Sequence, residues 1–72
     1  MSPEQKKKAI EGIIDTLDHI LADAKLRVTE AQDAMIHDEL NQAIGTLLGL
    51  DEKLQNAMAL YRTVIALHRE GR

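Results

Sequence analysis

Apolar side chains recur along nearly the whole chain with spacings that alternate between four and three residues. One such run extends from Ile10 to Met35 and a second from Ile36 to His68. Because a helix returns to the same face every 3.6 residues, this alternation predicts long helices that each pack one seam against a neighbour. The second seam consists of Ile36, Leu40, Ala43, Leu47, Leu50, Leu54, Ala57, Tyr61, Val64 and His68. We therefore expect an all-α fold, a small bundle of two to three helices.

The first helix is predicted to begin at Pro3. Ser2 and Gln5 have the spacing of a capping box, and proline is tolerated at a first helical position because no hydrogen-bond donor is missed there. Where this helix ends is open. Thr29 and Gln32 repeat the capping-box spacing, which favours a break, yet no Gly or Pro interrupts the seam at this point. Both a break near Thr29 and one continuous helix fit the pattern.

The seam changes phase once, between Met35 and Ile36, where it shifts by one position. The helix face therefore turns there whether or not the helix has broken earlier, and the shift is consistent with a change of packing partner. With a break, the pattern predicts helices of roughly 25, 20 and 20 residues, a hairpin preceded by an N-terminal helix. Without it, two helices result.

Two glycines, Gly45 and Gly49, lie four residues apart, a spacing that lets two helix backbones approach closely. Gly49 also has the context of a left-handed helix C-cap, because Leu50 follows as an apolar residue and Asp51 as a new N-cap. We expect a tight turn between helices at Gly49. The last helix then runs from residue 52 to about residue 70, with basic side chains toward its negative end.

The composition predicts self-association. A chain of 72 residues forms one domain, residues 1–72, with a thin core, and such small domains need disulfides, a metal or oligomerisation for stability. Cysteine is absent, and Tyr61 is the single aromatic residue. We therefore predict a homo-oligomer built on dimers. The oligomer seam is assigned to Ile36, Leu40, Leu47, Leu54 and Val64.

Two classes of location are disfavoured by the sequence. The N-terminal stretch is not followed by the apolar run of a secretory signal, and no segment approaches the roughly 20 apolar residues of a membrane span. The absence of cysteine fits a reducing compartment. We expect a cytoplasmic protein without a membrane partner.

Charge is distributed unevenly along the chain. The net charge is −3, with +2 in residues 1–8, −8 in residues 9–52 and +3 in residues 53–72. Nucleic-acid-binding domains usually carry a clearly basic face, so nucleic acid is disfavoured as a partner. Both ends of the sequence are basic and the middle is acidic.

The sequence has no convincing catalytic set. There is no cysteine, and the threonines have no base at helical spacing, so we expect no enzyme. Asp15, His19 and Asp23 are spaced by four, as are Asp33 and His37, which suits nitrogen and oxygen ligands on one helix face. Such charge stripes are usually surface, and the Glu-x-x-His pairs of di-iron bundles are absent. We predict no metal and no cofactor.

The last helix carries the best candidate for a ligand site. Tyr61 and His68 are one heptad apart on the seam, and Arg62 and Arg69 are one heptad apart beside it. This set suits a phosphate and a stacked base, although packing and the helix dipole explain the same residues without a ligand. In an antiparallel arrangement of subunits, Lys6, Lys7 and Lys8 of one chain would approach Arg62, Arg69 and Arg72 of another. The candidate ligand residues are Tyr61, Arg62, His68, Arg69, Lys6, Lys7 and Lys8.

Two functions follow from these patterns. The first is a non-enzymatic, homo-oligomeric helical interaction or scaffold protein that binds another macromolecule, which the wide apolar faces favour. The alternative is a small-ligand binder that sequesters an anion such as a nucleotide at basic oligomer interfaces. A lysine-rich RNA- or DNA-binding dimer is a third reading, and the acidic middle of the chain counts against it.

Overall fold

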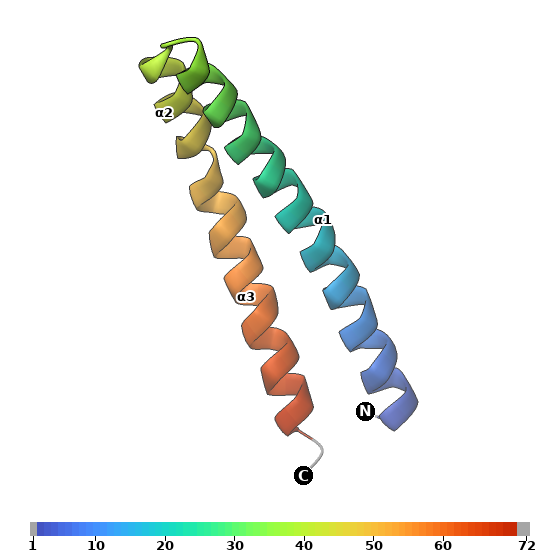
Figure 1. Ribbon diagram of the computed structural model, residues 1–72. Coiled ribbons are helices and arrows are strands. Elements are labelled where there is room, and N and C mark those ends of the chain that lie inside the picture. The colour runs from blue at the N-terminus through green and yellow to red at the C-terminus, as the bar shows by residue number, and fades with distance from the viewer. Residues whose placement is uncertain (1, 71–72) are drawn as a thin grey trace.

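The computed structural model describes residues 2–70 and shows a helical hairpin (Figure 1). Helix α1 (Pro3–Ile36) runs the length of the molecule, and α2 (Leu40–Leu48) and α3 (Leu50–Arg69) return beside it in the opposite direction. The start of α1 and the end of α3 lie at the same end of a rod that measures 54 × 15 × 12 Å. The prediction of an all-α fold is confirmed, and the described residues contain no strand.

Helix α1 begins as the sequence predicts. The hydroxyl of Ser2 accepts a hydrogen bond from the Gln5 amide at 3.2 Å, and the Gln5 side-chain oxygen accepts one from the Ser2 amide at 3.3 Å. The helix then continues without a break. At the suspected boundary, the Thr29 hydroxyl donates a hydrogen bond to the carbonyl oxygen of Lys25, 3.1 Å away, instead of capping a new helix. The continuous alternative is therefore correct, and the hairpin has no separate N-terminal helix.

The chain reverses at His37–Glu39, where Asp38 takes the left-handed conformation with φ 58°. The Glu39 amide donates to the carbonyl of Ala34 at 2.8 Å, and the Asp38 amide donates to that of Met35 at 3.0 Å. These two bonds form a Schellman motif, which satisfies carbonyls that a helix end leaves free. Aspartate tolerates the left-handed region better than most residues. The phase shift of the seam at Met35 thus marks the reversal of the chain.

The prediction of a left-handed cap and a tight turn at Gly49 is wrong. Gly49 has φ −70° and ψ −10°, which are right-handed helical values, and Asp51 lies inside α3 rather than capping it. Figure 1 shows α2 and α3 as two segments of one arm that changes direction only slightly at their junction. Gly49 resembles a C-cap in sequence because an apolar residue and an aspartate follow it. The chain has already reversed at Asp38, so the helix can continue through Gly49 in nearly the same direction.

Among residues 2–70, the buried side chains all belong to alanines. Ala31, Ala34 and Ala43 form a cluster beside the turn, and Ala24 and Ala57 are buried farther along the arms. Small side chains let the backbones approach closely, and the two arms are nearest to each other beside the turn and farther apart toward the termini (Figure 1). The hairpin therefore has a line of close contact but no enclosed core of large side chains.

The two helical glycines make this description testable by substitution. A Cβ on Gly45 would meet nothing within 4 Å, and a Cβ on Gly49 would lie 3.4 Å from the Thr46 carbonyl oxygen. Gly45→Ala should raise the free energy of unfolding by about 0.5–1 kcal/mol, because alanine loses less backbone entropy in a helix. Gly49→Ala should also stabilise, by a smaller amount. Urea denaturation followed by circular dichroism, at one fixed chain concentration, measures both changes.

A loss of stability in Gly49→Ala would contradict the right-handed backbone at this junction. Ala59→Gly, an exposed site inside α3, is the matched control and should destabilise by a similar amount to the gain at Gly45.

Candidate functional site: an apolar face and a basic end

The first half of the site is a groove between α1 and α2, beside the turn. We call it the turn groove; it is lined by Val28, Ala31, Gln32, Met35, Ile36, Ala43, Ile44 and Leu47. The two alanines are buried and form its floor, whereas Met35, Ile44 and Leu47 are exposed at its edges. Its lining is therefore apolar and open to solvent.

A second groove, the middle groove, lies between α1 and α3 at about half the length of the rod. It is lined by Leu17, Leu21, Leu54, Ala57, Met58 and Tyr61. Leu47 and Leu54 are seven residues apart, as are Leu21 and Val28, so the two grooves follow the same side of both arms. Together they make one apolar face, the name used below for the surface of both grooves.

The apolar face exists because the seam of each arm is wider than the contact between the arms. In α1, Ala24 and Ala31 face the other arm and are buried, whereas Leu21 and Met35, next to them on the helix surface, are each about half exposed. In α3 the same division separates buried Ala57 from Leu54, which is 50% exposed. The alanines of each predicted seam are buried inside the hairpin, whereas most of its large side chains stay partly or largely exposed.

The residues assigned to the oligomer seam lie at different places in this arrangement. Leu40, Leu47 and Leu54 are exposed, with the last two lining the apolar face, while Val64 is half-buried near the open end of the hairpin. Ile36 is 80% exposed at the end of α1, so it belongs to the first arm and not to the second.

Sequence reasoning missed two residues of the apolar face, Ile44 and Met58. Each follows a buried alanine, Ala43 and Ala57, in the sequence. Both side chains are about half exposed and line the grooves next to these alanines. Alanine followed by a large apolar residue is the signal that would have found them.

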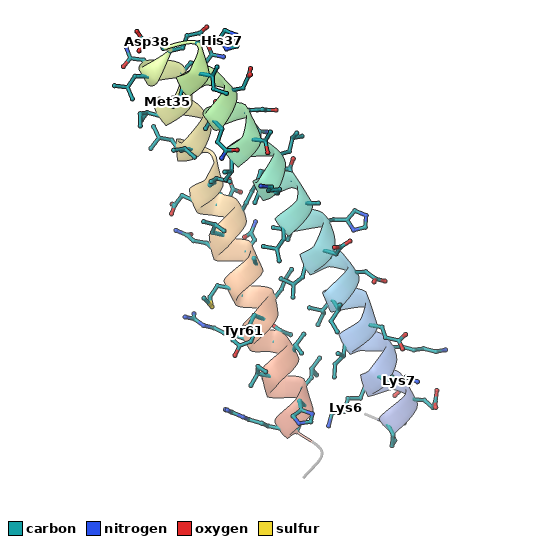
Figure 2. All side chains as sticks on the ribbon, viewed as in Figure 1. Lys6, Lys7, Met35, His37, Asp38 and Tyr61 are labelled. Carbon is teal, nitrogen blue, oxygen red and sulfur yellow. The ribbon has the colours of Figure 1, made fainter. Side chains whose placement is uncertain are left out.

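The second feature is a cluster of basic side chains at the open end of the hairpin, where α1 begins and α3 ends. Lys6, which lies between the arms (Figure 2), donates a hydrogen bond from Nζ to the carbonyl oxygen of His68 at 3.3 Å. Lys7 and Lys8 are exposed on the same first turns of α1, and Arg62 and Arg69 are exposed on α3. The hairpin brings these groups to one end of a single chain, whereas Arg72 lies outside the described residues.

Tyr61 belongs to the apolar face more than to the basic end. Its ring lines the middle groove beside Leu54 and Met58 and is about half exposed (Figure 2). His68 is two helical turns farther along α3, about 10 Å away along the axis. The structure therefore separates the aromatic ring from His68 and Arg69, while Arg62 stays next to it in sequence.

The histidines that resembled metal ligands bind backbone instead. His19 Nδ1 lies 2.8 Å from the Asp15 carbonyl oxygen, and His37 Nδ1 lies 2.9 Å from that of Asp33. The Asp33 carboxylate is 3.9 Å from the His37 ring, and both are solvent-exposed. Among residues 2–70 no group of three His, Asp or Glu side chains is placed to hold a metal ion.

One ion pair joins the arms at the middle of the rod. Lys53 on α3 pairs with the carboxylate of Asp23 on α1. The hydrogen bond from Lys53 lowers the pKa of Asp23 below its ordinary value. Desolvation opposes this shift in part, and the charges of Lys53 and Arg27 add smaller lowering effects. Because both side chains are partly exposed, solvent screens the pair and its contribution to stability is small.

Comparison with protein-family models, curated proteins and solved structures finds no match for this chain. Within the described residues, no helix has the length and apolar character needed to cross a bilayer.

The ion pair predicts a defined pH dependence. Since the folded pKa of Asp23 is lowered, the contribution of the pair is present above the pKa of an unfolded aspartate, about 3.9, and is lost as the pH falls through the lower folded value. Asp23→Asn should therefore lower the melting temperature at neutral pH, and its difference from wild type should shrink as the pH falls through the lowered pKa of Asp23. Thermal melts over a series of pH values from neutral to acidic test this.

Asp18→Asn, at an exposed α1 position outside the two ion pairs found in residues 2–70, is the matched control. An equal effect of both substitutions at neutral pH would show that the Lys53 pair contributes nothing specific.

Proposed function

We propose that this chain is a non-enzymatic, homo-oligomeric interaction protein, in which hairpins associate through the apolar face and the assembled bundle binds another macromolecule. The observation that carries the proposal is the contrast between the buried and exposed parts of the seam. Within the part of the chain that the structure describes, the buried positions hold alanine, whereas most of the large side chains of the apolar face remain about half exposed. Contiguous exposed apolar surface of this kind marks an interaction site in proteins.

The dimensions of the hairpin support self-association. Its radius of gyration is 16.6 Å, against about 11 Å for a compact domain of this length. Two arms alone cannot surround an apolar seam, whereas four helices enclose one in a bundle. Association therefore supplies the contacts that the single hairpin lacks.

A matched pair of substitutions tests self-association. Leu54 is 50% exposed in the middle groove, and Leu26 is 55% exposed on α1 but lines neither groove. Leu54→Asp should weaken association at least about tenfold, because it places an unpaired carboxylate in the apolar contact, and should unfold the chain as it dissociates. Leu26→Asp should leave the oligomer intact. Sedimentation equilibrium with circular dichroism measures both.

A folded wild-type monomer at micromolar concentration would refute the proposal. Equal effects of the two substitutions would also count against it, since the apolar face would then have no special role.

The second candidate function is the binding of a small anion, such as a nucleotide, at the basic open end. The supporting observation is that Lys6 reaches the last turn of α3, so the basic groups of both arms share one end of the hairpin. Arginine forks suit phosphate oxygens, and Tyr61 offers a ring on which a base can stack. Clustered like charges repel, and a bound anion would neutralise them.

Isothermal calorimetry with mono-, di- and cyclic nucleotides at low salt tests this candidate. We expect a saturable heat of binding that weakens as the salt concentration rises. Arg62→Ala and Arg69→Ala should each abolish this heat without loss of helicity. Arg27→Ala, which removes the same charge from a site distant from the open end, is the control. Absence of heat and of a thermal shift across the panel would leave the basic groups with no ligand role.

A further inference from the structure

We propose that the apolar face is covered by a second copy of this chain in antiparallel orientation, so that the turn end of each hairpin lies against the open end of the other. The inference rests on the self-association proposed above and adds the identity, extent and direction of the contact. Four observations carry it: surface area, the position of the middle groove, the shape of the two ends, and charge.

The exposed area of the hairpin matches what a dimer interface needs. The chain exposes 5651 Å², whereas a compact monomer of its mass exposes about 4,500 Å². The excess, roughly 1,200 Å², exceeds the about 800 Å² that each partner buries in a standard protein interface. A second hairpin laid along the apolar face would remove an area of this order from water.

The middle groove lies where a two-fold axis would pass. Leu21 is close to the midpoint of α1, and Leu54 is at the midpoint of the returning arm formed by α2 and α3. In a fully overlapped antiparallel pair, the axis crosses the centre of the rod, so this groove meets its own copy. Such a contact is self-complementary, with each leucine facing an equivalent apolar surface.

The turn end and the open end of the hairpin also complement each other in shape. The floor of the turn groove is made of the buried alanines Ala31 and Ala43, so this end is hollow. At the open end the seam carries the larger Ile10, Ile14 and Val64, which are exposed or half-buried. Antiparallel pairing places the large side chains of one copy over the alanine floor of the other.

Charge decides the direction. The turn end, residues 28–50, holds Glu30, Asp33, Asp38 and Glu39 and no Lys or Arg. The open end, residues 2–10 and 62–70, holds five Lys and Arg residues against two Glu, for a net charge of +3. Figure 2 shows Asp38 at the turn and Lys6 and Lys7 at the opposite end of the rod. A parallel pair would place like charges together, whereas an antiparallel pair places opposite charges together, which suppresses the wrong register.

Distances between spin labels distinguish the two directions. The chain has no cysteine, so Asn41→Cys and Gln55→Cys each give one labelling site, at exposed positions fourteen residues apart on the same side of the returning arm. In the antiparallel dimer, the Asn41 labels are separated by about 40 Å along the axis. The Gln55 labels, near the two-fold axis, lie on the order of 20 Å apart, as set by the width of the bundle.

Double electron–electron resonance on the two spin-labelled variants should therefore give a long distance between the labels at position 41 and a short one at position 55. Short distances at both positions mean a parallel dimer, which overturns the inference but leaves self-association standing. A monomeric mass with no dipolar coupling at either position overturns both. A mass that shows a dimer, with long distances at both positions, places the contact away from the apolar face and overturns the inference.

The salt dependence of the wild-type dimer provides a measurement without any substitution. Sodium chloride screens the attraction between opposite ends, so raising it from low to high concentration should raise the dissociation constant severalfold in the antiparallel pair. In a parallel pair the screened interaction is repulsive, and the dissociation constant should fall. A fall overturns the inference.

Discussion

The structure depends on a geometric limit: two helices in contact along one line can bury only the side chains on that line. Here the line is occupied mainly by alanine, and the wider apolar stripe of each helix remains exposed beside it. The alanines bring the arms close together near the turn, but they contribute little apolar area. Much of the large apolar surface of this sequence therefore stays exposed in the single hairpin.

Much of the fold could be predicted from the sequence, because its strongest signals are local or periodic. The cap at Ser2 and Gln5 forms as expected, and the alternating spacing correctly indicates two seams on long helices. The position of the turn could not be predicted from residue type alone. Gly49 satisfied the usual cap pattern, yet the left-handed residue is Asp38. The decisive signal was the phase shift after Met35, since a seam that changes phase has lost its helical continuity.

The candidate site was less accessible to sequence reasoning, because it depends on which segments the turn brings together. With the reversal at Asp38, Lys6 reaches His68 within one chain, so the basic groups of both arms meet without a second subunit. The same reversal places the acidic residues of the turn end, residues 28–50, at the opposite end of the rod. If a second copy lies antiparallel, its acidic turn neutralises the basic end, and a small anion would compete for that role. The two proposed functions are therefore coupled through one set of charges.

Because the chain reverses at His37–Glu39, the entropy cost of closing a loop between the two arms increases with distance from the turn. Joining Ala34 to Ala43 closes a loop of about nine residues, whereas joining Lys6 to His68 closes one of 62. Loop-closure entropy rises with length, so contacts next to the turn restrict the unfolded chain least. Each pair of residues added farther from the turn needs only a short extension once the previous pair is in place. The closest packing, beside the turn, therefore involves contacts that close the shortest loops. The contacts at the open end, where the arms are farther apart, close the longest loops.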